Sequence, residues 1–272
     1  TVLMNCVPAI VAGVKKIYLT TPSLDSKINP AVVYAAKKCG VKKIYKTGGA
    51  HSIAALAYGT KSFEKVDKIV GPGNLFVACA KKEVFGDVGI DMVAGPSEVS
   101  VVADKSADPD FIAADLIAQA EHDVQAQSIL ITNSKDIIRS VNLSLKKQLA
   151  RLPKKKIATQ SLRNFGLAIL TNSKKKITEI INTIAPEHLE LCTSFDKEII
   201  KGVKNAGSIF IGKFSPEAIG DYIAGPNHVL PTSGSARFSS GLSVNDFLKR
   251  HSLIKITKTG IERLGSSVIN LA

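Results

Sequence analysis

The feature that most constrains the fold is a near-exact internal repeat. The segment GVKKIYLT at 13–20 recurs as GVKKIYKT at 40–47. Between the two copies lies a helical pattern that begins at Asn29-Pro30 and ends at Gly40. Proline in the first turn and glycine just past the last turn are the residues that helices favour at these ends. A strand, a helix and a second strand at this spacing predict a right-handed crossover between parallel strands.

The same alternation continues along the chain. A short helix is expected at 52–58 and a third strand at 68–70. After the turn Gly95-Pro96-Ser97 a second series begins, with strands expected at 99–103, 128–132, 167–171 and 208–211, and helices at 109–121, 134–150 and 174–184. We therefore predict an α/β fold of two Rossmann-like domains with parallel sheets. The predicted domains cover residues 1–97 and 98–240, followed by a truncated helical C-terminal region at 241–272.

Composition narrows the class of protein. The chain has 272 residues, 45% of them hydrophobic, which is enough to bury a sizeable core. No apolar run reaches the length that a membrane helix needs. The net charge of +13 comes largely from lysine clusters without interleaved aromatic residues, at 146–147, 154–156 and 174–176. These clusters favour solvated helix ends and loops over a nucleic-acid groove, so neither nucleic acid nor membrane is expected as a partner.

The four cysteines are widely separated and form no C-x-x-C pair. This pattern argues against a disulfide framework and against a thiolate metal site. It is typical of a reducing compartment, and a cytoplasmic location is expected.

Two pairs of polar residues are candidates for chemistry. Gln119 and His122 are three residues apart in the predicted helix, so they are expected on one face, where they would offer zinc an amide oxygen and an imidazole nitrogen. Alone, such a pair is more often an ordinary surface feature. Glu187-His188 places two proton-transfer groups side by side, as repeated acid–base steps require. We expect Glu187-His188 in a loop before an apolar stretch.

Two Gly/Pro-rich segments are further candidates. The turn Gly71-Pro72-Gly73-Asn74 follows a strand and precedes a helix, so its amides are placed to face an anion, although from the residues alone a simple tight turn is the favoured explanation. Asn74 is its side chain best able to reach a ligand. Gly220-Asp221 and His228 lie in a segment that we predict to be a long loop, and long loops in compact domains are often functional.

Seven motifs, taken in order, connect these candidates to one family. They are GGAHSIAALAYGT at 48–60, VDKIVGPGN at 66–74, DMVAGPSE at 91–98, QAEH at 119–122, APEHL at 185–189, GDY at 220–222 and PNHVLPT at 226–232. In this order and spacing the chain resembles histidinol dehydrogenases over essentially its whole length.

The resemblance implies a zinc-dependent homodimer with active sites shared between subunits. Such an enzyme oxidises L-histidinol to L-histidine through the aldehyde histidinal, passing two hydrides in turn to NAD. Carried over by motif, the implied zinc ligands are Gln119, His122 and Asp221, and the implied acid–base pair is Glu187 and His188. Ser97, together with Gln119, His122, His188 and Asp221, is implied to bind substrate. Asn74 is implied to contact NAD, and His51 stands where the family commonly has a cofactor-contacting Gln.

These roles make chemical sense. Zinc suits the amine and imidazole nitrogens of the substrate and fixes the carbinol against the nicotinamide. His188 has a pKa range suited to taking the hydroxyl proton, and Glu187 is suited to activating water for attack on the aldehyde. NAD supplies the hydride chemistry, and the protein supplies position and charge.

The resemblance also implies that the chain is an internal fragment. Family members have a longer N-terminal region with an NAD-contacting tyrosine, and a C-terminal segment with a substrate-binding glutamate and a fourth zinc ligand, a histidine. A catalytically impaired fragment, acting at most as a binding or assembly partner, is therefore an alternative. A zinc hydrolase that uses Glu187 and His188 on water is a third hypothesis. His228 is balanced between a role near substrate or metal and simple loop structure, and His251 is expected to be a solvated residue of the helical C-terminal region.

Overall fold

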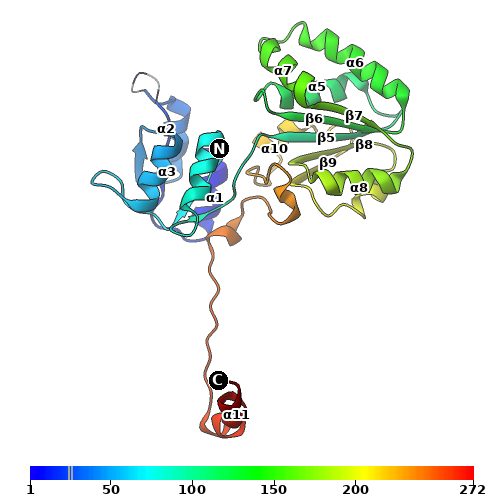
Figure 1. Ribbon diagram of the computed structural model, residues 1–272. Helices are drawn as coiled ribbons and strands as arrows, with labels where there is room; N and C mark the ends of the chain where they lie inside the picture. The colour runs from blue at the N-terminus through cyan, green and yellow to red at the C-terminus, as the bar shows by residue number, and fades with distance from the viewer. Residues whose placement is uncertain (24, 26) are drawn as a thin grey trace.

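The computed structural model describes residues 1–23, 25 and 27–272. Figure 1 shows two α/β lobes joined by an extended segment, and a C-terminal helix that stands apart at the end of a second extended segment. The first lobe contains α1 (Val2–Val11), β1 (Tyr18–Thr20), α2 (Pro30–Lys38), β2 (Lys43–Tyr45), α3 (Gly49–Tyr58), β3 (Lys68–Ile69), α4 (Leu75–Val84) and β4 (Gly89–Ile90).

The repeat that opens the sequence forms the predicted parallel crossover. β1 and β2 pair in parallel, with Tyr18 opposite Lys43. The connecting helix α2 begins as expected, because the Asn29 side chain accepts a hydrogen bond from the Ala31 backbone N–H at 2.9 Å. Within the described residues the first lobe holds two separate two-stranded parallel sheets, β1-β2 and β3-β4.

The second lobe is built on a five-stranded parallel sheet of order β7-β6-β5-β8-β9. Its strands are β5 (Glu98–Ala103), β6 (Gln127–Thr132), β7 (Gly166–Leu170), β8 (His188–Cys192) and β9 (Ser208–Ile211). Its helices are α5 (Pro109–Ala120), α6 (Lys135–Leu149), α7 (Lys155–Phe165), α8 (Lys174–Ile184), α9 (Asp196–Ile200) and α10 (Glu217–Tyr222). The α/β class with parallel sheets is thereby confirmed.

Helices cover both faces of this sheet, which explains why β5 reads as a nearly continuous apolar run. Val101 faces α5 and α6, where it packs with Ile112 and Val141. Its neighbour Val102 faces α8 and α9, where it packs with Ile177. The middle of the sheet is therefore sealed from solvent, and it buries the Glu190 carboxyl at the centre of β8.

Several sequence predictions are wrong in detail. His188 does not lie in a loop, because it is the first residue of β8 and pairs with both Val99 and Ser208. Asp221 also leaves the predicted loop, since it lies in α10. α7 was not expected at all. These differences arise where tertiary pairing, rather than local sequence, decides the backbone.

The C-terminal region is only partly helical. α11 (Lys258–Leu271) is a helix, but residues 248–257 have no regular structure, and His251 is an exposed residue of that segment. Before it, the short helix η2 (Val244–Phe247) returns to the first lobe, where Lys68 Nζ donates to the Asp246 carbonyl. The domain limits at 97 and 240 stay predictions.

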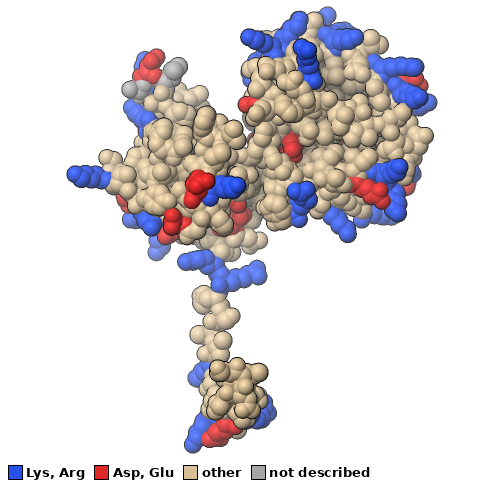
Figure 2. All heavy atoms as spheres, viewed as in Figure 1, with Lys and Arg blue, Asp and Glu red and all other residues tan. Residues whose placement is uncertain are grey.

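The surface agrees with the reading of the lysine clusters. The residues at 146–147, 154–156 and 174–176 are exposed at the end of α6 and the starts of α7 and α8. Figure 2 shows Lys and Arg side chains along the outer side of the second lobe. All four cysteines are free thiols. Among the helices that the structure describes, none has the length and apolar character needed to cross a bilayer.

Candidate active site

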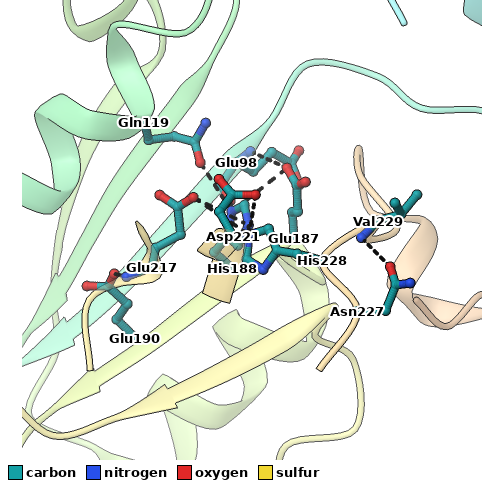
Figure 3. Close-up of polar contacts among 10 residues, drawn as sticks. All are labelled: Glu98, Gln119, Glu187, His188, Glu190, Glu217, Asp221, Asn227, His228 and Val229. Carbon is teal, nitrogen blue, oxygen red and sulfur yellow. Dashed lines mark hydrogen bonds and ion pairs between the residues drawn. The ribbon is translucent and has the colours of Figure 1, made fainter. Parts of the chain in front are cut away.

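The candidate site lies at the amino edge of the five-stranded sheet, where β5 and β8 begin (Figure 3). Ligands of open parallel sheets usually bind at the opposite, carboxyl edge. Here that edge is occupied by the Asp104 carboxylate, which accepts hydrogen bonds from the side chains of Ser106, Thr193 and Ser194. The candidate polar cluster lies instead where β5, β8, the end of α5 and α10 converge.

His188 is held in one tautomer. It is only 3% exposed, and its Nδ1 lies 3.0 Å from the Glu98 carbonyl oxygen and 3.2 Å from Gln119 Oε1. Both neighbours accept hydrogen bonds, so Nδ1 carries the proton and Nε2 keeps its lone pair. Burial lowers the pKa of His188 to about 4, against the opposing charge of Glu217. At neutral pH this residue is an uncharged imidazole whose basic nitrogen, Nε2, carries no proton.

His228 faces that basic nitrogen. The two Nε2 atoms are 3.0 Å apart, and the rings stack with centroids 4.9 Å apart at an angle of 20°. Since His188 Nε2 has no hydrogen, His228 Nε2 is the donor of this bond. Gly220 permits the approach, because a Cβ at that position would lie 2.6 Å from His228 Nδ1.

Glu217 adds a carboxylate to the two imidazoles. It is buried, and its Oε1 lies 3.7 Å from His188 Nε2 and 3.8 Å from His228 Nε2. Burial acts to raise its pKa, but the nearby histidines His228, His188 and His122 lower the pKa overall. Its backbone N–H donates to Glu190 Oε1 at 2.9 Å, which fixes the start of α10.

His188, Glu217 and His228 together could hold a metal ion. One donor atom from each lies within 4.8 Å of the others. Two imidazole nitrogens and one carboxylate oxygen form a donor set that zinc accepts in proteins.

Glu187 is a buried acid beside the histidines. Its Oε2 accepts the Glu98 backbone N–H at 3.1 Å and lies 3.9 Å from His188 Nδ1. Burial raises the pKa of Glu187 to about 8, although hydrogen bonds from the Glu98 backbone and the Ser97 side chain oppose this shift. The carboxyl group is therefore protonated at neutral pH.

Most of the site residues implied by the motifs meet at this edge. Ser97, Gln119, Glu187 and His188 converge, and Asp221 Oδ1 lies 3.8 Å from His228 Nε2. Figure 3 shows Asp221 directed toward the two histidines.

The premise for pairing Gln119 with His122 is wrong. α5 ends at Ala120, so His122 lies in the turn beyond it, exposed, whereas Gln119 is buried. The shared-face argument therefore does not extend to His122, although His122 lies near enough to Glu217 to lower the pKa of that carboxyl. The zinc-ligand assignment rests on the motif alone and stays a prediction.

The two predicted cofactor residues lie in the first lobe, away from this cluster in sequence. His51 is exposed in the first turn of α3, and Asn74 caps the start of α4, where its Oδ1 accepts the Val77 N–H at 3.1 Å. Their contact with NAD stays a prediction.

Sequence reasoning missed Glu98 and Glu217 and left His228 open. Glu98 directly follows Ser97 in a motif that was used, and Glu217 precedes Asp221 by one helical turn. The four-residue spacing of Glu217 and Asp221 could have indicated that they lie together, once the segment is known to be helical, because residues four apart share a helix face.

Known proteins identify the family. A family model described as histidinol dehydrogenase matches residues 1–272. The chain is 58% identical to histidinol dehydrogenase from Pelagibacter ubique and 55% identical to that from Clostridium acetobutylicum. Both matches cover 100% of this chain but only 64% and 63% of the relatives, so the chain spans less than two thirds of their length.

Solved structures agree on the architecture. The crystal structure of histidinol dehydrogenase from Elizabethkingia anophelis superimposes with a TM-score of 0.93 at 45% identity, covering 100% of this chain and 63% of that one. An acetylating aldehyde dehydrogenase from Geobacillus thermoglucosidasius shares the fold alone, with a TM-score of 0.59 at 14% identity and coverage of 95% of this chain and 73% of that one. The chain belongs to the histidinol dehydrogenase family.

Proposed function

We propose that the chain carries the core of a zinc-dependent, NAD-linked active site that oxidises L-histidinol to L-histidine through histidinal, the last steps of histidine biosynthesis. Family membership supports the substrate. The single observation that supports the chemistry is His188, a buried and neutral imidazole whose Nδ1 proton is fixed by the Glu98 carbonyl and whose Nε2 carries no proton and accepts a hydrogen bond from His228. A neutral base at neutral pH is what removal of a carbinol proton requires.

Residues at the amino edge of the sheet fit a zinc ion. The motif assigns Gln119, His122 and Asp221 as ligands, and Gln119 and Asp221 already approach the histidine pair. The cluster of His188, Glu217 and His228 is a second possible donor set with suitable chemistry. We favour the motif assignment, because it leaves His188 free to act as a base. When bound, zinc would supply a Lewis acid that fixes the amine and imidazole of the substrate.

His188 takes the proton in the first oxidation. Its Nε2 would accept the hydroxyl proton of the substrate. NAD, when bound, would supply the hydride acceptor. The charge that then forms on the ring is stabilised by the hydrogen bond from Nδ1 to Glu98 and by the nearby Glu217 carboxylate. The substrate, in this arrangement, displaces the His228 ring nitrogen from His188.

Glu187 serves the second oxidation. Once ionised, its carboxylate accepts a proton from the water that attacks the aldehyde carbon. Because burial raises its pKa to about 8, the ionised form becomes abundant only at alkaline pH. Ser97 orients this carboxyl group and, with Gln119, His122, His188 and Asp221, would line the substrate site.

The cofactor is proposed to bind the first lobe. Asn74 and His51 lie at the starts of α4 and α3, two helices that pack against each other. Helix N-termini after parallel strands are suited to anionic groups, and this pattern supports a Rossmann-like role for the lobe. By the same family argument, the working protein is proposed to be a homodimer with shared active sites.

The test is formation of NADH from L-histidinol by the zinc-supplemented chain, followed at its absorbance band. NADH formation that requires both histidinol and zinc would support the proposal. Binding of zinc or histidinol without any NADH would instead support a non-catalytic fragment, an alternative that the 64% coverage of relatives keeps open.

A further inference from the structure

A buried ion pair lies beneath the glycine turn at 71–74. The side chains of Lys81 on α4 and Asp91 after β4 are 2% and 1% exposed and contact each other directly. Lys81 Nζ also donates to the Gly71 carbonyl at 3.0 Å, and Asp91 Oδ2 accepts the Gly71 N–H at 2.8 Å. The pair therefore holds both backbone polar groups of one glycine.

The turn has a shape that only glycine permits at two places. Gly71 has φ +119°, in the region that L side chains rarely adopt. A Cβ at Gly73 would lie 2.5 Å from the Val77 side chain. Asn74 then closes the turn by capping α4 at Val77 N–H. The turn is thus held by hydrogen bonds on its buried side, while Pro72, Gly73 and Asn74 are exposed to solvent.

Stability alone does not account for the ion pair. Removing two charges from water costs several kcal/mol per ion, and an apolar pair of similar volume is often as stable or more so. The neighbouring core shows that apolar packing is available here, since Ile69 and Val84 belong to one buried cluster. An apolar pair could not form hydrogen bonds with both the N–H and the carbonyl of Gly71, as Asp91 and Lys81 do.

We propose that Lys81 and Asp91 are positioning residues of the dinucleotide site. They hold the turn at 71–74 in the conformation that presents Asn74 and the start of α4 to the cofactor. This inference rests on the proposed NAD-linked function. It adds that affinity for the dinucleotide depends on two buried residues that do not touch it, because a preorganised turn loses less conformational entropy on binding.

The test is a fluorescence titration of the zinc-supplemented chain with NADH. Lys81→Met should weaken NADH binding by about tenfold through loss of preorganisation, while zinc content is unchanged. Val84→Ala is the matched control, because it removes a buried side chain from the same helix without touching Gly71. It should lower thermal stability but leave NADH affinity within about twofold, since it creates only a cavity.

A double variant separates positioning from stability. Lys81→Met leaves the Asp91 charge buried and unpaired, and Lys81→Met/Asp91→Asn removes that charge. The double variant should therefore recover thermal stability, but its NADH affinity should stay low because the Gly71 carbonyl is still unheld. Asp91→Asn alone should fold and show an intermediate affinity.

The outcomes are distinct. NADH binding that follows thermal stability across all four variants, or that equals wild type in Lys81→Met, would overturn the positioning role and leave the proposed function intact. Absence of NADH binding by the wild-type chain would contradict the cofactor site itself, and this inference with it.

Discussion

The Nε2 atoms of His188 and His228 face each other at 3.0 Å, with the Glu217 carboxylate beside both. Because the Glu98 carbonyl holds the proton on the far side of the His188 ring, the basic nitrogen points toward His228. In the free chain the unprotonated Nε2 of His188 therefore accepts a hydrogen bond from His228, which a substrate would have to replace in the proposed reaction.

Replacing His188 distinguishes an effect on NADH formation from an effect on zinc binding. His188→Ala should reduce NADH formation by roughly 10²–10⁴-fold, the usual contribution of a general base, with little loss of bound zinc. Steady-state NADH formation and metal analysis measure the two effects. His251→Ala is the matched control, since His251 is exposed and lies outside both lobes. Loss of zinc along with activity would show that His188 is a ligand.

The two possible donor sets make opposite predictions for metal content. If Gln119, His122 and Asp221 bind zinc, His122→Ala should lose most of the metal, and Glu217→Gln should keep it. Removing one ligand of a zinc site leaves too few donors for tight binding. Zinc per chain after dialysis decides the matter. Retention in His122→Ala with loss in Glu217→Gln would contradict the motif assignment and favour the cluster of His188, Glu217 and His228.

Gly220 is predicted to be required for the position of His228. A Cβ there would lie 2.6 Å from His228 Nδ1 and 3.0 Å from the Phe210 ring. Gly220→Ala should cost about 1–3 kcal/mol by overpacking and should reduce NADH formation by moving His228 or α10.

The control for this variant is Gly265→Ala in α11. A Cβ at Gly265 meets nothing closer than 3.9 Å, so this variant should be neutral or mildly stabilising. Urea denaturation measures both variants. Equal stability of Gly220→Ala and wild type would show that the approach of α10 to His228 is looser than described.

The raised pKa of Glu187 predicts how the free energy of unfolding depends on pH. Its pKa rises from an ordinary value of 4.5 to about 8 on folding. Between these values the folded chain holds a proton that the unfolded chain has lost. Stability is therefore greatest below pH 4.5 for this group and falls as pH rises toward 8, with a limiting slope of about 1.4 kcal/mol per pH unit.

Glu187→Gln should remove its share of that slope in the metal-free chain, because an amide does not titrate. The rest of the slope should remain, since burial also raises the pKa of Glu190 to about 9 and that of Asp115 to about 6. Denaturation midpoints at several pH values between 5 and 8 would reveal the difference. A wild-type slope that persists unchanged in Glu187→Gln would mean that another group carries the effect.

Much of the fold follows from local sequence signals. Asn29, Asp108, Ser134 and Ser173 each cap the helix that was expected after them. The strand at 208–211 lies where it was predicted. Such caps and apolar runs act within a few residues, so a single sequence contains them.

The parts that were missed depend on distant contacts. α10 has six residues with Gly220 inside it, a poor helix by propensity, and Gly220 is accommodated where His228 packs closely against it. β8 begins at His188 because β5 and β9 pair with it on both sides. Glu98 and Glu217 join the site only through that pairing and through the placement of α10. The motif predicted Glu187 and His188, but the neighbours that set their pKa values come from tertiary structure.

The most direct test of the central claim is the stoichiometry of NADH formed per L-histidinol consumed, measured on the zinc-supplemented chain with limiting substrate. Complete oxidation through histidinal predicts two NADH and one L-histidine per histidinol, and predicts that Glu187→Gln slows the second oxidation more than the first. No NADH from a chain that binds both zinc and histidinol would contradict the claim that this site performs the oxidation.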